Sequence, residues 1–281
     1  MAGIDYEVEY NNRARVPEHA EIFARWSRDA EFYRAEALKA GHAELGLSYG
    51  DTDRQSLDLF FPRATQNPPL ALFIHGGWWR SLDPSMFSHL ARGLNEHGVT
   101  VAVAGYDLCP NVTIGDIVVQ IRRACIFLWQ RFGQRTLAVG HSAGGHLTAA
   151  MVATNWREEF PKAPADLVPA GYAISGVFDL LPLLHISANE DFRLDEASAR
   201  ALSPALWPVA SGRVFDAVVG GLESNEFKRQ SRSIASAWQG PARTRYEEIS
   251  GTNHFTVLDP LNDPSSPMVA RIVQLARQIG T

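Results

Sequence analysis

Short apolar segments alternate with helical stretches along most of this chain, and the alternation limits the folds open to it. Several segments are continuously hydrophobic, as in parallel strands that helices cover on both faces. Such strands are expected at Leu57–Phe61, Leu70–His75, Val99–Gly105, Thr136–Gly140, Ala170–Ser175, Val214–Gly220 and Arg245–Ile249. The sequence therefore predicts an α/β fold with a mostly parallel central sheet and helices on both faces.

Between two of these segments, apolar residues recur at steps of three and four, which places them on one face of a helix. These residues are Ile114, Ile117, Val118, Ile121, Cys125, Leu128 and Phe132. Two segments fall outside the alternation. Residues 17–40 predict an N-terminal helical extension, and residues 180–212 predict a small cap insertion within a single domain spanning 1–281. Either segment is a candidate wall of a substrate pocket.

Composition and charge limit the classes of partner that the protein is expected to bind. The chain of 281 residues has a formal net charge of −5 and no basic stripe, which argues against nucleic acid or anionic membranes. It lacks both a signal-peptide pattern and an apolar run of roughly 18 residues. Its two cysteines, Cys109 and Cys125, are expected to be reduced thiols. We expect a cytoplasmic protein that binds a small-molecule substrate, with a homodimer left open.

Residues 140–145 read Gly-His-Ser-Ala-Gly-Gly and match the pattern G-x-S-x-G, with Ser142 at its centre. An expected strand, Thr136–Val139, precedes the run, and an expected helix, His146–Ala153, follows it. Strand, sharp turn and helix are the context in which a serine hydroxyl is held exposed as a nucleophile. Ser142 is therefore the predicted nucleophile.

A serine hydroxyl needs a general base within hydrogen-bond reach. Of the nine histidines, His254 lies in a loop after the last expected strand, where parallel-sheet topology brings it beside the serine. His141 and His146 flank Ser142 and are expected to pack or to make structural hydrogen bonds. His75 is expected to order its own loop. His254 is therefore the predicted base.

A second turn precedes the serine. Residues 75–79 read His-Gly-Gly-Trp-Trp and resemble the His-Gly-Gly segment that builds an oxyanion hole in many esterases. The predicted donors are the N–H groups of Gly76, Gly77 and Ala143, because glycine allows close backbone approach. This turn, the serine and the histidine occur in the chain order of an α/β-hydrolase.

A carboxylate must orient the histidine, and it should follow the strand Val214–Gly220. The first carboxylate beyond that strand is Glu223. Glu226 is the rival, although it is expected to begin the next helix, where a carboxylate favours the helix dipole. Asp179 is a less favoured substitute, and Asp216 lies within the strand. Glu223 is the predicted acid.

The chain resembles the α/β-hydrolase form of the kynurenine formamidase (arylformamidase) family over nearly its whole length. Five blocks carry the resemblance: Tyr10–Arg13, His75–Trp79, Gly140–Leu147, Ser175–Leu180 and Glu226–Ser231. The resemblance implies an α/β-hydrolase fold and hydrolysis of N-formyl-L-kynurenine to kynurenine and formate. It transfers the family's serine and histidine to Ser142 and His254.

The family's acid is an aspartate in a Gly-Glu-His-Asp-Ser-Pro-Glu-Phe-like block, whereas here the aligned position holds Glu223. Glutamate is one methylene longer, so its loop is expected to sit further back. Beside the predicted catalytic groups, the candidate substrate-binding residues are Trp78, Trp79, His141 and Phe255.

Two other functions also fit these residues. A carboxylesterase acting on short-chain or aryl esters would use the same three residues. A non-catalytic small-molecule receptor is the other, although such proteins often lose the histidine or the acid. No metal-ligand spacing is visible, so no metal and no cofactor are expected.

Overall fold

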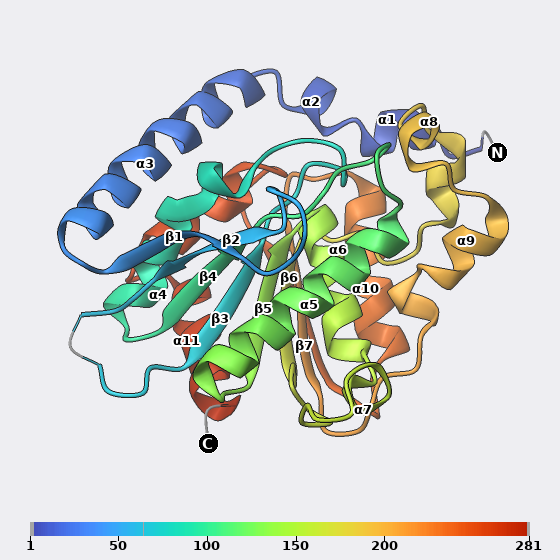
Figure 1. Ribbon diagram of the computed structural model, residues 1–281. Helices are drawn as coiled ribbons and strands as arrows, with labels where there is room; N and C mark the ends of the chain where they lie inside the picture. Colours follow the sequence, from blue (N-terminus) through green and yellow to red (C-terminus); the bar gives the residue numbers. More distant parts are fainter. Residues whose placement is uncertain (1–2, 64, 280–281) are drawn as a thin grey trace.

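The computed structural model describes residues 3–63 and 65–279, whose strands form one eight-stranded sheet (Figure 1). The strand order is β1-β2-β4-β3-β5-β6-β7-β8. The strands are β1 (Ala43–Ser48), β2 (Ser56–Phe60), β3 (Leu70–Ile74), β4 (Thr100–Ala104), β5 (Thr136–His141), β6 (Ala170–Ile174), β7 (Val214–Gly220) and β8 (Arg243–Ile249). Strand β2 pairs antiparallel with β1 and β4, and all other neighbours are parallel.

Helices connect the strands. The α-helices are α1 (Tyr6–Tyr10), α2 (Asn12–Arg15), α3 (His19–Lys39), α4 (Arg92–Glu96), α5 (Ile114–Phe132), α6 (Ala143–Ala153), α7 (Trp156–Glu159), α8 (Asn189–Phe192), α9 (Glu196–Ala201), α10 (Asn225–Ala237) and α11 (Pro267–Ile279). The 3₁₀ segments are η1 (Pro84–Ala91), η2 (Leu181–His185), η3 (Pro204–Leu206) and η4 (Thr256–Asn262).

The predicted fold class is confirmed, and all seven predicted strands are present with ends shifted by at most two residues. Strand β1 was missed. It is a partly exposed edge strand, its register shifts between Glu44 and Leu47, and Gly46 has a φ of +68°. A strand interrupted in this way carries little of the apolar periodicity from which strands are predicted.

The two faces of the sheet bury separate apolar clusters. Along β3, Leu70, Leu72 and Ile74 belong to a cluster shared with α5, α6 and α10. The alternate residues Ala71 and Phe73 belong to a cluster shared with α3, η1 and α11. Figure 1 shows α5 and α6 in front of the strands and α11 behind them. Burial on both faces explains why the strands are continuously hydrophobic.

Helix α5 forms where the periodicity predicts it. Six of its seven predicted apolar residues are buried, and the seventh, Phe132, is partly buried. Thr113 and Asp116 form a capping box at its start, and Gly133 ends it in the left-handed conformation with a φ of +66°. The capping residues supply the local signals that bound the helix on both sides.

The N-terminal extension matches its predicted range closely, with α3 spanning His19–Lys39. Two short helices, α1 and α2, precede it and run along the upper edge of the sheet in Figure 1. The Tyr10 hydroxyl lies 3.1 Å from Glu226 and accepts a 2.8 Å hydrogen bond from Gln230, both on α10. These buried contacts tie the N-terminal segment to a helix more than 200 residues away in sequence.

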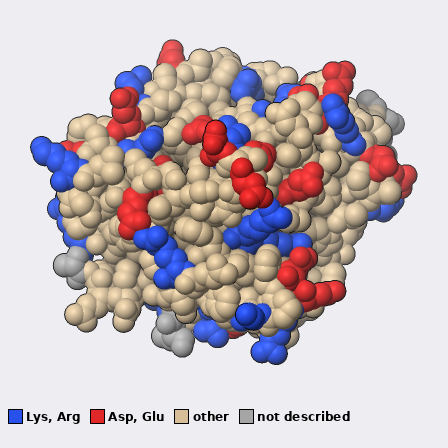
Figure 2. All heavy atoms as spheres, in the orientation of Figure 1, with Lys and Arg blue, Asp and Glu red and all other residues tan. Residues whose placement is uncertain are grey.

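The molecular surface carries both signs of charge. In Figure 2, basic and acidic side chains interleave over the visible face, with no basic stripe. Cys109 and Cys125 are free and buried. Within residues 3–63 and 65–279, no helix combines the length and hydrophobicity needed to cross a membrane.

The turn between β5 and α6 depends on close backbone contact. Ser142 has φ and ψ of +56° and −117°, a conformation that L-residues rarely adopt. A Cβ atom on Gly144 would lie 1.9 Å from the Ile74 carbonyl oxygen, and one on Gly140 would lie 2.1 Å from the Gly144 carbonyl oxygen. Helix α6 starts at Ala143, three residues before the predicted start at His146, because Gly144 and Gly145 are helical. The missing side chains of Gly140 in β5 and Gly144 in α6 let the turn close.

Gly144→Ala should destabilise the fold, because the new methyl group would collide with the backbone of β3 rather than with a movable side chain. We expect the free energy of unfolding to fall by about 3 kcal/mol or more. The matched control is Gly115→Ala on α5, where the nearest atom is 3.6 Å away. The control should change stability by less than about 1 kcal/mol. Urea unfolding measures both, and equal effects would contradict the steric account.

Candidate active site

The carboxyl edge of the sheet brings Ser142, His254 and Glu223 into one hydrogen-bonded chain. His254 Nε2 lies 3.1 Å from Ser142 Oγ, and His254 Nδ1 lies 2.6 Å from Glu223 Oε2. All three residues are buried, at 3, 4 and 7% exposure. A neutral His254 that donates its Nδ1–H to the carboxylate presents Nε2 as an acceptor to the serine hydroxyl. The arrangement can remove a proton from Ser142 as its oxygen attacks.

Parallel pairing of β7 and β8 places the acid beside the histidine. The two strands end together, with Gly220 opposite Ile249 in the register. Beyond them, the N–H of Leu222 donates to the Thr252 carbonyl at 2.9 Å. The Asn253 side chain accepts 2.9 Å hydrogen bonds from backbone N–H groups at the start of η4, which shapes the turn carrying His254. The two turns are therefore fixed relative to each other by backbone contacts.

The Glu223 side chain, one methylene longer than the aspartate of the formamidase family, folds back toward the end of β7. Its Oε1 accepts hydrogen bonds from the Gly220 N–H, at 2.6 Å, and from the Ser175 hydroxyl. The other oxygen remains free for His254. Three donors around one buried carboxylate hold its charge and its orientation. Ser175 follows β6 and opens one of the blocks that resemble the formamidase family.

The rival carboxylates lie elsewhere. Glu226 is in the first turn of α10, as predicted, and pairs with Arg229 at 2.8 Å. Asp179 accepts from the backbone after β6, and Asp216 pairs with Arg271 at 2.7 Å. Each rival is engaged with its own partner, and only Glu223 contacts His254 among the described carboxylates.

Backbone N–H groups converge on the serine from two sides. Ala143 opens helix α6, where the first N–H groups have no intrahelical acceptor. Within the described residues, nothing accepts a hydrogen bond from the N–H groups of Ala143, Gly76 or Gly77. A Cβ atom on Gly76 would lie 3.0 Å from Ser142 Cβ, and Gly77 has a φ of +106°. Free donors beside the serine suit an oxyanion that forms there.

His141 fixes the loop that carries His254. Its Nε2–H donates to the His254 carbonyl at 2.8 Å, and the two rings are 4.8 Å apart. Burial, reinforced by the nearby His254 ring, holds the pKa of His141 well below its ordinary value. A neutral His141 adds no positive charge beside His254, which favours the proton transfer from Ser142 to His254.

His75 and His146 are also structural. Burial lowers the pKa of each to about 4. His75 stacks on Tyr106 with ring centroids 4.3 Å apart, and His146 donates to the Leu202 carbonyl at 2.8 Å. Both stay uncharged near neutral pH, and neither imidazole ring hydrogen-bonds to the Ser142 side chain.

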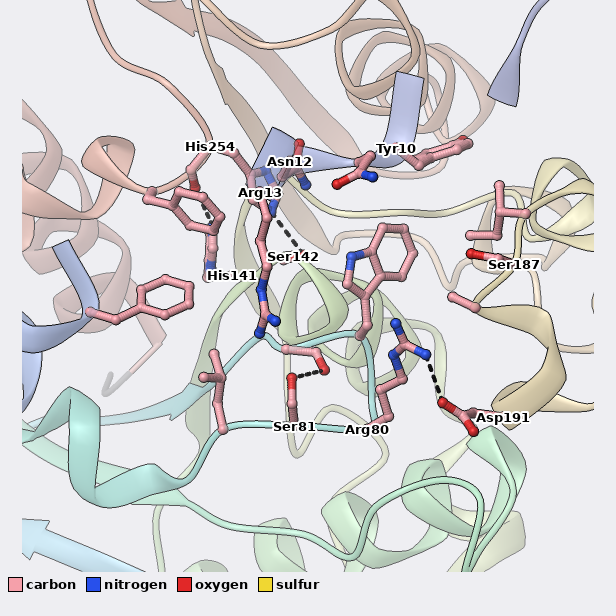
Figure 3. A pocket seen from close by; sticks show the side chains of 18 of the residues that line it. Tyr10, Asn12, Arg13, Arg80, Ser81, His141, Ser142, Ser187, Asp191 and His254 are labelled. Carbon is pink, nitrogen blue, oxygen red and sulfur yellow. Dashed lines mark hydrogen bonds and ion pairs between the residues drawn. The ribbon is translucent and has the colours of Figure 1, made fainter. Parts of the chain in front are cut away.

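A cavity of about 470 Å³ opens in front of the serine (Figure 3). Of the predicted site residues, those that line it are Gly77, Trp78, His141, Ser142, His254 and Phe255. Both segments proposed as pocket walls contribute, Phe23 and Trp26 from α3 and Ile186 and Asp191 from the insertion. Among the described residues, no group of three His, Cys, Asp or Glu side chains is arranged to hold a metal ion.

The two tryptophans predicted to bind substrate, Trp78 and Trp79, lie in different environments. Trp78 is partly buried and lines the cavity, with its ring 5.8 Å from Tyr10 and 6.0 Å from Phe192. Trp79, predicted to bind substrate, instead lies fully buried outside the cavity wall, edge-on to His146 at 5.1 Å. Both have a positive φ, so consecutive side chains leave the turn in different directions. Trp79 is therefore a core residue.

The segment before the predicted extension at 17–40 had no predicted role in the pocket, yet five of its residues line the cavity. They are Glu7, Tyr10, Asn11, Asn12 and Arg13. The sequence did contain a signal for such a role, because Tyr10–Arg13 is one of the five blocks that resemble the formamidase family. Its distance from the serine in sequence concealed the contact, which only the folded chain creates.

Comparisons with known proteins agree with this geometry. Residues 71–279 match the alpha/beta hydrolase family. The chain is 29% identical to a kynurenine formamidase of Salmo salar, covering 78% of this chain and 77% of that one. A kynurenine formamidase of Drosophila melanogaster is also 29% identical, covering 76% and 75%. A solved structure from Silicibacter sp., named provisionally as a thioesterase, is 36% identical with a TM-score of 0.84, covering 96% and 99%.

Replacing Glu223 tests the contact with His254. Glu223→Gln should lower kcat for p-nitrophenyl acetate by roughly 10³- to 10⁴-fold, because an amide does not stabilise the imidazolium. Glu223→Asp should retain more activity, although its shorter side chain lengthens the 2.6 Å hydrogen bond. Glu226→Gln, at the rival carboxylate, should lower kcat by less than about tenfold. Equal losses in the Glu223→Gln and Glu226→Gln variants would contradict the assignment.

The buried neutral histidines predict loss of stability in acid. Below pH 6.5 an unfolded chain protonates His75 and His146, whereas the folded protein excludes those protons down to about pH 4. The free energy of unfolding should therefore decrease as the pH falls from 6.5 to about 4. His146→Gln, which retains a donor for Leu202, should flatten this decline in urea unfolding, whereas the exposed His97→Gln should not. An unchanged slope for His146→Gln would contradict the argument.

Proposed function

Because the chain belongs to the alpha/beta hydrolase family, and is therefore a hydrolase, we propose that it cleaves a small acyl group through Ser142, His254 and Glu223. The substrate we propose is an aryl formamide, N-formyl-L-kynurenine, which would give kynurenine and formate. The observation that supports this most is the hydrogen-bonded chain at the edge of an aromatic cavity, in a protein similar to kynurenine formamidases over three quarters of its length.

The first half of the proposed reaction forms a formyl-enzyme. Ser142 Oγ attacks the formyl carbon while His254 Nε2 takes the serine proton, and Glu223 stabilises the resulting imidazolium. The carbonyl electrons move to oxygen, which the N–H groups of Ala143, Gly76 and Gly77 stabilise. The intermediate collapses, the C–N bond breaks, and His254 returns its proton to the departing aryl amine.

The second half regenerates the enzyme. A water molecule donates a proton to His254 and attacks the formyl ester, and the tetrahedral intermediate again places its oxygen against the same N–H groups. The C–O bond to Ser142 then breaks, His254 protonates Oγ, and formic acid leaves and releases its remaining proton to solvent as formate. His254 thus acts as a base and an acid in each half, so one histidine suffices.

The cavity wall suits an aryl leaving group. Five Phe, Tyr or Trp side chains line the space before Ser142, namely Tyr10, Phe23, Trp26, Trp78 and Phe255. Flat apolar walls of this kind bind aromatic rings through stacked or edge contacts. At about 470 Å³, the cavity has the size of a small-molecule site.

Ester hydrolysis is the second candidate function, because the same three residues perform it and the Silicibacter relative is named provisionally as a thioesterase. A receptor without catalysis is disfavoured by the hydrogen bond from Ser142 to His254 and the contact of His254 with Glu223.

Kinetics with matched substrates test the proposal. We expect kcat/KM for N-formyl-L-kynurenine to exceed that for p-nitrophenyl acetate and butyrate by about tenfold or more, which is roughly 1.4 kcal/mol of transition-state discrimination. Ser142→Ala should abolish turnover of all three. A preference for the esters would establish an esterase instead, and turnover that survives in Ser142→Ala would contradict the mechanism.

A further inference from the structure

Four charged side chains line the cavity, and most are already engaged. Arg80 pairs with Asp191 at 2.6 Å, as Figure 3 shows. Glu7 accepts hydrogen bonds from the Ser187 N–H at 2.7 Å and from its hydroxyl at 3.0 Å. Arg13 is the remaining one: its guanidinium lies over the Phe23 ring, and it has no carboxylate partner among the described residues. The cavity therefore contains one cation whose charge and donors are uncommitted.

Arg13 is exposed and also lines the cavity, so a ligand in the cavity can reach it. It lies on α2, and in Figure 3 its side chain extends into the cavity that Ser142 also lines. Its guanidinium carbon is 5.8 Å from the centroid of the Phe23 ring, another wall residue. An arginine held against an aromatic ring keeps its planar N–H fork free for a carboxylate.

The neighbouring Asn12 provides an independent observation. The residue is 5% exposed and lines the same cavity. Its Nδ2 atom is buried and has no hydrogen-bond acceptor among the described residues. Buried polar groups in folded proteins nearly always have a partner, so an unpaired amide at a cavity wall indicates a missing acceptor. An anionic oxygen would supply it.

The short helix that carries both residues is held in place. The Asn11 side chain accepts a 3.1 Å hydrogen bond from the Ala14 N–H at the helix start. Immediately before it, the Tyr10 hydroxyl is fixed by Gln230 and Glu226 of α10. The backbone that carries Asn12 and Arg13 is thus held by a local hydrogen bond within the helix and by long-range hydrogen bonds to α10. Ligand binding therefore requires little further ordering of this backbone.

We propose that Arg13 and Asn12 form a carboxylate-binding subsite, which orients substrates that carry an acidic group on the side of the scissile bond away from the acyl group. The inference rests on the proposed function and deepens it by naming the residues that would distinguish aryl formamides with an acidic side chain from neutral ones. Arginine binds a carboxylate through two parallel N–H donors, and the Asn12 amide supplies a third.

Paired substrates test the subsite. N-formyl-L-kynurenine and its desamino analogue carry the carboxylate, whereas ortho-formamidoacetophenone offers the same aryl formamide without it. Arg13→Ala should lower kcat/KM for the two acids by roughly 10- to 100-fold, mainly through KM, as expected for loss of hydrogen bonds to a charged group. Turnover of the neutral formamide should change by less than about threefold, which also shows that the variant is folded.

Two further variants sharpen the test. Asn12→Asp keeps the size of the side chain but replaces its amide donor with a carboxylate that repels an acidic ligand. It should therefore also lower kcat/KM for the two acidic formamides and spare the neutral one. Arg15→Ala, an exposed change on the same short helix outside the cavity lining, should leave every substrate unaffected.

Each result supports or overturns the subsite. Equal losses for acidic and neutral formamides in Arg13→Ala would assign Arg13 a structural role and overturn the subsite, while leaving the proposed function intact. The subsite is likewise overturned if the wild type cleaves all three formamides equally well and Arg13→Ala changes none. Absence of any Ser142-dependent formamide turnover in the wild type would reject the proposed function, and the subsite with it.

Discussion

The contact between the start of helix α6 and the end of strand β3 is the constraint on which the site depends. Gly144 packs so closely on the Ile74 carbonyl that no side chain fits between them. This contact forces Ser142 into a strained turn, aims its hydroxyl out of the sheet and leaves the Ala143 N–H unpaired beside Gly76. The same backbone contact therefore positions both the nucleophile and the donors for the oxyanion. The buried sheet around the turn keeps Ser142 in its strained conformation.

A second set of contacts joins segments that are far apart in the chain. Parallel pairing of β7 and β8 ends both strands at one level, so the turns that carry Glu223 and His254 are bonded to each other. Tyr10, which also lines the cavity, connects the N-terminal segment to α10 through Glu226 and Gln230. Burial raises the pKa of Tyr10 well above its ordinary value, so its hydroxyl stays protonated and can serve this network. The cavity is thus closed by a segment that the sheet itself does not include.

Burial also determines which side chains of the site carry a charge. His141 and His146 are enclosed by apolar packing, which keeps them neutral, and they act through hydrogen bonds to backbone carbonyls. The negative charge is concentrated on Glu223, where three donors surround it. Around the cavity, one ion pair joins Arg80 to Asp191, while Arg13 keeps its donors uncommitted. The site therefore combines a carboxylate surrounded by hydrogen-bond donors, which orients His254, with an arginine at the cavity wall that has no carboxylate partner among the described residues.

By itself, the sequence determined the fold class, seven of eight strands and the residues that form the hydrogen-bonded chain, because apolar periodicity and local motifs depend on neighbours along the chain. It did not determine β1, whose glycine and register shift erase the periodicity, nor the burial of Trp79, whose direction follows from a positive φ. Only the tertiary structure decided that Asn12 and Arg13 line the cavity, since their contact with it arises from packing between α1 and α10. Local order is encoded in adjacent residues, whereas a cavity wall is assembled from distant ones.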